Sequence, residues 1–292
     1  MNLALFGRTV TDPMLPYLQE FIQRLEGMSG TTLIYKPFYD RLNGRITFSK
    51  SPELFLQETD LHGKVDFLCT IGGDGTILDA VALTKNSGIP IIGVNMGRLG
   101  FLSSISKDEI IPAMEDIFAS NYTLEDRTLL HLHGKENLYG GFPFALNELT
   151  IHKSDVQTML MIQVFINDEF LNSYWADGLI VSTPTGSTAY SLSCAGPIVT
   201  PNSENFVITP IASHNLTVRP IVIRDDSRIR IVVEGNGEDF FVAMDSRKEK
   251  VHSGMELIVT KAGFSVRLVR LPGRHFFKTI REKLNWGLDA RN

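Results

Sequence analysis

The stretch Val65-Asp66-Phe67-Leu68-Cys69-Thr70-Ile71-Gly72-Gly73-Asp74-Gly75-Thr76 decides the fold of the first half of the chain. Its apolar run, Val65 to Ile71, predicts a buried strand, and the residues from Ile77 to Lys85 predict a helix. The glycines between them let the backbone turn tightly and approach a ligand closely. A strand, a glycine-rich turn and a helix in this order favour a parallel sheet covered by helices.

The neighbouring segments repeat this alternation. Residues 3–6 and 89–94 predict further strands, and residues 13–28 and 107–119 carry apolar side chains at helical spacing. Ser51-Pro52-Glu53 predicts another helix start, with serine as the N-cap and proline at the first helical position. We therefore expect an α/β domain with a Rossmann-like parallel sheet over residues 1–122.

Short strands replace this alternation after about residue 122. The expected strands are residues 129–133, 144–152, 159–166, 173–182, 206–211, 221–223, 229–234, 240–245, 255–260 and 265–271. Strands at such intervals predict an all-β sandwich over residues 123–273. A C-terminal helix is predicted within residues 274–292, and we expect it to pack back on the first domain.

The overall composition is that of a globular protein. The 292 residues are 43% hydrophobic and 21% charged, which suits two domains with sizeable cores. A net charge of -5 argues against a duplex nucleic-acid partner. The two cysteines, Cys69 and Cys194, lack metal-ligand spacing, and the sequence shows neither a signal peptide nor an apolar run of membrane length. We expect a cytoplasmic protein with no membrane partner.

The turn at residues 72–76 predicts a phosphate site. Free N–H groups at a helix start point at an anion in front of them. Thr76 is expected to cap the helix, and Asp74 brings a carboxylate close to phosphates or a hydroxyl. The pattern is neither Walker A nor the dinucleotide fingerprint. It resembles the motif of NAD kinases, of diacylglycerol and sphingosine kinases and, in related form, of phosphofructokinases, which implies phosphoryl transfer and leaves the acceptor open. A plain tight turn is the alternative.

Further stretches resemble the NAD kinase family in particular. They are Asn95-Met96-Gly97-Arg98-Leu99-Gly100-Phe101-Leu102, Asn147-Glu148, Ala176-Asp177-Gly178, Thr183-Pro184-Thr185-Gly186-Ser187-Thr188-Ala189-Tyr190-Ser191-Leu192-Ser193 and the tail Phe276–Trp286. With the glycine-rich turn they span residues 72 to 286 in family order. Alone, Asn147-Glu148 would fit a surface pair and Asp177-Gly178 an ordinary turn. Thr183 to Ser193 shows no packing reason for so many hydroxyls.

The resemblance implies an activity. An NAD kinase transfers a phosphoryl group from ATP, another nucleoside triphosphate or polyphosphate to the 2′-hydroxyl of the adenosine ribose of NAD, giving NADP. It also implies Mg²⁺ or another divalent cation that arrives with the donor, without a tightly held protein-ligated metal. A homodimer or homotetramer is expected from the same resemblance.

The resemblance also assigns residues to roles, with Asp74 as the catalytic residue that accepts or orients the proton of the hydroxyl. The expected NAD-binding residues are Asp74, Gly75, Asn147, Glu148, Asp177, Thr188, Ala189, Tyr190, Ser191, Leu192, Ser193 and Ala212. The expected donor-phosphate residues are Gly72, Gly73, Thr76 and Arg98. Carboxylates suit ribose diols because they are acceptors, and Asn147 is both donor and acceptor. We expect the site to lie between the two domains, with Asp74 facing the ribose.

Several features leave alternatives open. Where the family usually has Ser-Ala-Gly-Gly-Pro, this chain has Ser193-Cys194-Ala195-Gly196-Pro197, and Asp245-Ser246-Arg247 replaces the frequent Asp-Gly-Gln. Lys153, Arg98 and Arg247 are candidate phosphate contacts, and the pair His131 and His133 lacks an evident third metal ligand. The rival functions are a lipid or sugar kinase that shares the turn, and a non-catalytic NADP-binding regulator.

Overall fold

The structure is a computed structural model that describes residues 1–28, 30–97, 100–134, 138–154, 159–234 and 239–287. The chain divides into two compact units: Met1–Asp126 with Val266–Asn292, and Arg127–Ser265. The boundaries fall inside two strands, β7 (Thr123–His133) and β18 (Glu256–Arg270), so each of these continues from one unit into the other. Among the described residues, no helix is both long and apolar enough to cross a membrane.

The first unit is built on a parallel sheet. Its strands are β1 (Leu3–Gly7), β2 (Thr32–Tyr35), β3 (Glu53–Phe55), β4 (Phe67–Ile71), β5 (Ile91–Asn95) and β6 (Ile105–Ser106). The order β3-β2-β1-β4-β5 is parallel throughout, and β18 joins β5 in parallel through Leu268 and Ile91. The order reverses between β1 and β4, and a crevice outside the carboxyl ends of the strands at such a point is where ligands bind in open α/β sheets.

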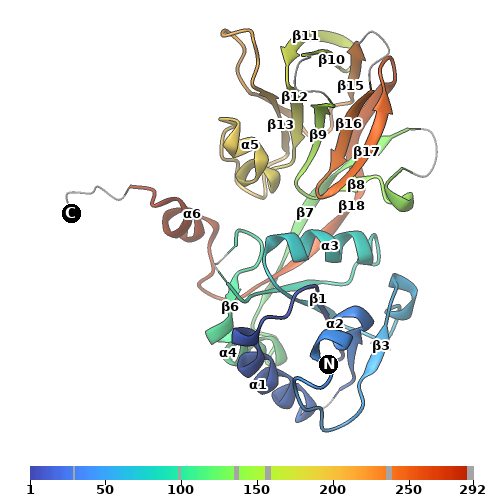
Figure 1. The fold of residues 1–292 in the computed structure, drawn as a ribbon. Helices are drawn as coiled ribbons and strands as arrows, with labels where there is room; N and C mark the ends of the chain where they lie inside the picture. Colours follow the sequence, from blue (N-terminus) through green and yellow to red (C-terminus); the bar gives the residue numbers. More distant parts are fainter. Residues whose placement is uncertain (29, 98–99, 135–137, 155–158, 235–238, 288–292) are drawn as a thin grey trace. The chain divides into compact units, whose positions relative to one another are not determined.

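Helices cover both faces of this sheet (Figure 1). They are α1 (Leu15–Glu26), α2 (Lys36–Leu42), α3 (Asp74–Thr84) and α4 (Ile110–Phe118). The unit also contains α6 (Phe276–Leu284), which follows β18, and 3-10 turns at Asp12–Met14, Glu58–Asp60 and Lys107–Glu109. Helix α1 buries Leu18, Phe21, Ile22 and Leu25 in the core that the sheet shares with α4. Positions three and four apart lie on one helical face, which is why this pattern predicted the helix.

One expectation for this unit was wrong. Ser51-Pro52-Glu53 does not start a helix, because Glu53–Phe55 forms strand β3 and pairs in parallel with β2. Phe55 is buried while Leu54 is exposed, which is the two-residue alternation of a strand. The sequence did not predict β2 or α2 either. These elements depend on pairing with the rest of the sheet, which a local pattern does not report.

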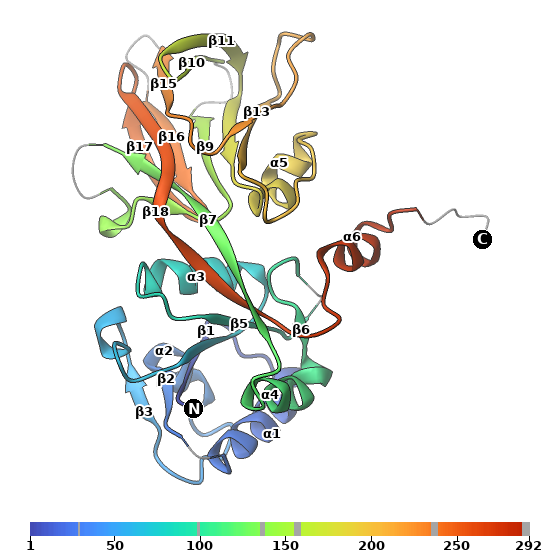
Figure 2. The same ribbon diagram turned by 180° about the vertical axis from the view of Figure 1, so that it is seen from behind.

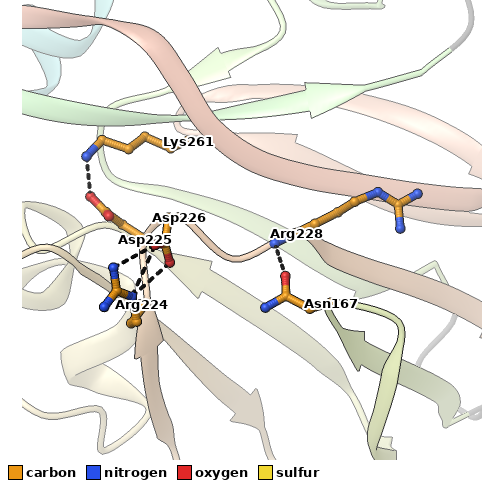
Figure 3. Close-up of polar contacts among 6 residues, drawn as sticks. All are labelled: Asn167, Arg224, Asp225, Asp226, Arg228 and Lys261. Atoms are coloured by element: carbon orange, nitrogen blue, oxygen red, sulfur yellow. Dashed lines mark hydrogen bonds and ion pairs between the residues drawn. The ribbon is translucent and has the colours of Figure 1, made fainter.

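The second unit is a sandwich of two sheets (Figure 2). Its other strands are β8 (Phe144–Ala145), β9 (Glu148–Lys153), β10 (Leu160–Ile166), β11 (Glu169–Ala176), β12 (Gly178–Ser182), β13 (Asn205–Ile211), β14 (Ile221–Arg224), β15 (Ile229–Glu234), β16 (Asp239–Met244) and β17 (Arg247–His252). Short helical segments lie at Leu138–Gly141, Gly186–Thr188 and α5 (Tyr190–Ser193). One sheet has the antiparallel order β14-β13-β12-β9-β16-β17.

The opposing sheet runs β11-β10-β15-β18, and β7 pairs with β18 and with β8. Inward side chains of both sheets form one apolar core, in which Phe206 and Phe240 are fully buried. The predicted fold class, an α/β domain followed by an all-β domain, is confirmed.

The strands of this unit differ from the expected ones at informative places. The expected strand 144–152 is interrupted after Ala145, and the expected strand 173–182 divides at Asp177. Residues 255–260 and 265–271 lie on the single strand β18, and β17 was not predicted. Both interruptions fall at polar residues singled out from the sequence, so the chain leaves the sheet where those side chains are presented.

Candidate active site

The Gly72–Thr76 turn connects β4 to α3 at the carboxyl end of the sheet. The N–H of Gly72 donates to the carbonyl of Val94 at 2.9 Å, so the turn is tied to β5. Gly72 has φ +155°, and a Cβ there would lie 2.1 Å from Oγ1 of Thr76. A side chain at this position is therefore excluded both by the backbone and by contact.

Helix α3 begins earlier than expected. Its first residue is Asp74 and its N-cap is Gly73, which has no side chain to cap the helix. Thr76 was expected to be the cap, and that was wrong, because it lies inside the first turn and its N–H donates to the carbonyl of Gly73. The helix start consequently has no side-chain acceptor from its own cap, which leaves N–H groups for an anion.

A pocket of about 450 Å³ lies in the first unit beside this turn. It is lined by Thr9, Thr11, Pro13, Met14, Ile71, Gly72, Gly73, Thr76, Asn95, Met96, Gly97 and Lys107. These residues follow β1, β4, β5 and β6, so the pocket lies at the point where the strand order reverses. Its volume is that of a small-molecule site.

Asp74 is held by the loop that follows β5. Its Oδ2 accepts from the N–H of Phe101 at 2.7 Å, and its Oδ1 accepts from the N–H groups of Leu102 and Ser103 at 3.1 and 2.9 Å. The hydroxyl of Ser103 adds a fourth bond at 2.8 Å. A carboxylate is an acceptor only, so four donors fix its position and orientation.

The side chain of Asn95 stabilises the same loop. Nδ2 of Asn95 donates to the hydroxyl of Ser103 at 3.0 Å, and Oδ1 of Asn95 accepts from the N–H of Gly97 at 2.7 Å. A Cβ on Gly100 would lie 1.8 Å from Oδ1 of Asp74, so glycine is required at that position. Asn95, Gly100 and the backbone of Phe101 and Leu102 therefore position Asp74 together with Ser103, which the sequence did not reveal. Arg98 and Leu99 lie outside the described residues.

In the second unit, Asn147 and Glu148 stand where the chain passes from β8 to β9. Asp245 fixes this turn: its carboxylate accepts from the N–H groups of Leu146 and Asn147 at 2.8 Å each and of Glu148 at 3.2 Å. On the other side, the carbonyl of Asn147 accepts from the N–H of Thr183 at 2.9 Å. The pair is thus fixed through its own backbone, with the side chain of Asn147 buried and that of Glu148 partly buried.

Glu148 has an unusual environment. Its Oε2 is buried without a hydrogen-bond partner among the described residues. Burial, and next the charge of Asp245, raise the pKa of Glu148 to about 8, although a bond from the backbone of Tyr190 opposes this. At neutral pH the side chain therefore carries a proton, so it can donate as well as accept a hydrogen bond.

Asp177 lies between β11 and β12 and is paired with Lys153. The distance from Nζ of Lys153 to Oδ1 of Asp177 is 2.6 Å, and the N–H of Asp177 donates to the carbonyl of Ile211 at 3.0 Å. Lys153 was a candidate phosphate contact, but its ammonium is engaged by this carboxylate. Gly178 is required behind the turn, since a Cβ there would lie 2.1 Å from the carbonyl oxygen of Ile151.

The hydroxyls of Thr183–Ser193 have a structural role that the sequence did not suggest. The hydroxyls of Thr183 and Ser187 donate to the carbonyls of Leu146 and Pro184, and that of Ser191 bonds Oγ1 of Thr209 at 2.9 Å. The expectation that packing could not explain these hydroxyls was wrong, because a buried loop must satisfy its polar groups internally.

Accessible residues remain on this loop, and they lie near the acidic pair. Thr188, Ala189, Tyr190, Leu192 and Ser193 are at least partly exposed, whereas Ser191 is buried. The pKa of Tyr190 is raised, first by burial and then by Cys194, Asp177 and Glu148. The second unit thus brings Glu148, Asp177 and Tyr190 together. Ala212 follows β13, is exposed and has φ 47°.

Arg247 and the histidines His131 and His133, which were also considered from the sequence, contact other parts of the protein. The guanidinium of Arg247 donates to the carbonyl of Phe142 at 2.5 Å and to that of Phe144, and it lies over the rings of Tyr139 and Phe142. Two backbone carbonyls thus engage its guanidinium, and the phosphate contact considered from the sequence stays a prediction. His131 stacks on Phe144 and lies 4.0 Å, centroid to centroid, from His133, whose Nε2 bonds Oγ1 of Thr260.

Asp245 and Ser103 were missed as site residues, although both fix proposed ligand-binding groups. The sequence drew attention to Asp245-Ser246-Arg247 because of its departure at Arg247, and not because of the aspartate. No local pattern marks either residue, since their partners lie 97 to 99 and 29 residues away in the chain. Among the described residues, no group of three or more His, Cys, Asp or Glu could hold a metal ion.

Comparison with known proteins identifies the family. The model of the ATP-NAD kinase N-terminal domain matches residues 46–122, and that of the ATP-NAD kinase C-terminal domain matches residues 146–271. An NAD kinase of Cytophaga hutchinsonii is 44% identical over 293 residues, and one of Flavobacterium johnsoniae is 40% identical over 294; both alignments cover 100% of this chain and 100% of the relative.

Solved structures agree with this. A yeast NADH kinase complexed with NADH has a TM-score of 0.87 at 26% identity and covers 100% of this chain and 89% of its own. An NAD kinase from Archaeoglobus fulgidus in complex with ATP shares the fold, with a TM-score of 0.72 at 24% identity over 98% of this chain and 99% of its own. On its sequence and on the two matched domains, this chain belongs to the ATP-NAD kinase family.

Proposed function

We propose that this chain transfers the terminal phosphoryl group of ATP to the 2′-hydroxyl of the adenosine ribose of NAD, producing NADP. The observation that carries the proposal is the Asp74 carboxylate, fixed by four hydrogen bonds at the start of α3 beside a pocket of about 450 Å³. The relatives named NAD kinase, the yeast enzyme solved with NADH and the archaeal enzyme solved with ATP support the choice of substrates.

The donor phosphates are proposed to bind at the glycine-rich turn. Gly72, Gly73 and Thr76 line the pocket, and the N–H groups at the start of α3 favour an anion there. Arg98 remains a sequence prediction for the same role. Stabilising charge on the transferring oxygens is the main task in such a reaction, because the transition state is loose.

A divalent cation fits this arrangement only in association with the donor. The described residues offer no cluster of three metal ligands, and the oxygens of Asp74 already accept four hydrogen bonds. Phosphate oxygens would therefore supply most of the ligands for Mg²⁺. When bound, the cation would neutralise charge on the phosphates.

The proposed role of Asp74 concerns the acceptor hydroxyl. As the 2′-oxygen forms its bond to the terminal phosphorus, the bond from that phosphorus to the bridging oxygen breaks and the nucleoside diphosphate leaves. The hydroxyl proton must be lost, and the Asp74 carboxylate orients or accepts it. Because little deprotonation is needed early in a loose transition state, orientation is the larger contribution.

NAD is proposed to be bound by the polar set of the second unit. The carboxylate of Asp177 accepts from ribose hydroxyls, while protonated Glu148 offers both a donor and an acceptor. Tyr190 is exposed and offers an aromatic face to a base. The remaining proposed contacts are Gly75, Asn147, Thr188, Ala189, Ser191, Leu192, Ser193 and Ala212, of which Ser191 would act through its backbone because its hydroxyl is engaged.

The test is a matrix of donors and acceptors with Mg²⁺ and purified protein. ATP, GTP and polyphosphate are combined with NAD, NADH, diacylglycerol and sphingosine, and NADP or the phosphorylated lipid is quantified. Formation of NADP from ATP and NAD is expected. Phosphorylation of a lipid instead would establish the rival kinase function, and NADP binding without turnover would establish the regulator.

Cytoplasmic localisation and a homodimer or homotetramer stay predictions. Sedimentation of the purified protein tests the oligomeric state.

A further inference from the structure

Lys107 is a residue of the pocket that no motif of the sequence singled out. It is the first residue of the 3-10 turn Lys107–Glu109, directly after β6, and it lines the pocket together with Gly72 and Gly73. Among the described lining residues it is the one with a charged side chain. A cationic residue and the helix start of α3 thus border the same pocket, and both favour an anion.

Tyr17 of α1 determines where the ammonium of Lys107 lies. Nζ of Lys107 donates to the hydroxyl of Tyr17 at 2.7 Å and lies 4.1 Å from the centroid of its ring. These contacts restrict a side chain that would otherwise lose much rotamer freedom on binding a ligand. The bond from Tyr17 is also the largest cause that raises the pKa of Lys107, so the side chain stays charged.

The ammonium of Lys107 can still donate hydrogen bonds to a ligand. It has three donors, one of which the Tyr17 hydroxyl accepts. The carboxylate of Asp108 is 3.7 Å away, which is an ion pair without a short hydrogen bond. A phosphate oxygen can therefore be bound while the contact with Tyr17 is kept.

The rest of the lining indicates what accompanies the phosphates. Pro13, Met14 and Met96 give the pocket an apolar wall, and Thr9 and Thr11 add hydroxyls. An anion alone would not use such a wall, whereas a base or ribose attached to the phosphates would pack against it. The lining thus suits a nucleoside triphosphate better than a chain of phosphates alone, which needs several cations.

We propose that Lys107, held in place by Tyr17, binds the phosphate tail of a nucleoside triphosphate donor in this pocket. The proposal rests on the proposed function for the identity of the reaction, but the binding itself does not depend on turnover. Lys107 contributes to affinity for the donor and not for NAD.

The test compares Lys107→Met with Lys107→Arg and Tyr17→Phe. Methionine keeps an unbranched apolar side chain and removes the charge, so the KM for ATP should rise about tenfold or more while the KM for NAD stays unchanged. Lys107→Arg should retain most of the affinity for ATP. Tyr17→Phe keeps the ring and removes the acceptor, so a smaller rise of about threefold is expected. Lys64→Met, an exposed lysine of the same unit, is the matched control and should leave both constants unchanged.

A binding measurement separates this proposal from the proposed function. The Kd of a non-hydrolysable ATP analogue with Mg²⁺ is measured by calorimetry for the same variants, together with that of inorganic tripolyphosphate. Weaker binding of the analogue to Lys107→Met, and tighter binding of the analogue than of tripolyphosphate to the unaltered chain, are expected even if no NADP is formed. Unchanged analogue affinity in Lys107→Met, or an equal loss for NAD, overturns the role of Lys107. Equal affinities for the analogue and tripolyphosphate overturn the nucleoside assignment.

Discussion

Glu148 and Asp245 are joined by two reciprocal hydrogen bonds: the N–H of Glu148 donates to Oδ1 of Asp245 at 3.2 Å, and the N–H of Asp245 donates to the carbonyl of Glu148 at 3.0 Å. The two carboxyl groups therefore lie close together in a partly buried place. Asp245 accepts three N–H bonds, whereas Oε2 of Glu148 has no partner among the described residues. Burial raises the pKa of Asp245 as well, but its three N–H bonds oppose this, so the charge is better stabilised on Asp245 and the proton resides on Glu148.

This relationship predicts a pH dependence of stability. The pKa of Glu148 is raised from 4.5 to about 8, so between these pH values the folded chain keeps a proton that the unfolded chain loses. Its contribution to the free energy of unfolding is fully present below about pH 4.5 and is lost as the pH rises towards 8. Glu148→Gln cannot ionise, so its stability should decline less over this range than that of the unaltered chain.

Urea unfolding at several pH values measures this difference. Glu169→Gln, at an exposed position of β11, is the control and should follow the unaltered chain. Parallel stability profiles for Glu148→Gln and the unaltered chain would show that Glu148 is ionised in the folded state as in the unfolded one.

A second prediction concerns Asp74. Asp74→Asn should lower kcat on the order of 10³-fold while the Kd of NAD changes little, because the amide neither accepts the proton nor orients the hydroxyl as a carboxylate does. Ser103→Ala removes one of the four donors and should cause a smaller loss of about tenfold. Steady-state kinetics and calorimetry give the two quantities. Near-normal turnover of Asp74→Asn would exclude Asp74 from the reaction, and Asp40→Asn, on the exposed surface of α2, serves as the control.

Gly100 provides a steric test of the same site. Its Cβ would lie 1.8 Å from Oδ1 of Asp74, so Gly100→Ala must displace the carboxylate or the loop. We expect kcat to fall at least about tenfold and the free energy of unfolding to fall by about 1–3 kcal/mol. In Gly27→Ala the added carbon meets its nearest atom at 3.5 Å, which is ordinary contact, and activity should be retained. Full activity of Gly100→Ala would mean that the position of Asp74 against this loop is not needed.

A fourth prediction distinguishes structure from ligand binding at Arg247. Because its guanidinium bonds the carbonyls of Phe142 and Phe144, Arg247→Ala should lower the free energy of unfolding by about 1–3 kcal/mol and leave the KM for ATP within about twofold. Lys250→Ala on the same strand breaks a surface ion pair with Asp239 and should cost less than about 1 kcal/mol. A large rise in the KM for ATP with unchanged stability would restore the phosphate contact considered from the sequence.

Much of the fold could be predicted from local patterns of apolar residues in the sequence. The helices α1, α3 and α4 and the strands β1, β4 and β5 were predicted within a few residues, because apolar periodicity reports which face is buried. Elements such as β3 and β17 were not, since their place depends on a partner strand and not on their own residues. The breaks at Asn147 and Asp177 were not predicted either, since strand pairing decides where a strand ends.

The sequence by itself determined the glycine-rich turn, the family resemblance and the residue types offered to a ligand, because these are properties of short segments. Only the tertiary structure decided how those residues are held. Asp74 meets Ser103, Asn147 meets Asp245 and Lys107 meets Tyr17 across 29, 98 and 90 residues of chain. Hydrogen bonds depend on the distance and direction between two atoms in space, and the number of residues between them in the sequence determines neither. The same geometry assigned the hydroxyls of Thr183, Ser187 and Ser191 to the protein's own interior.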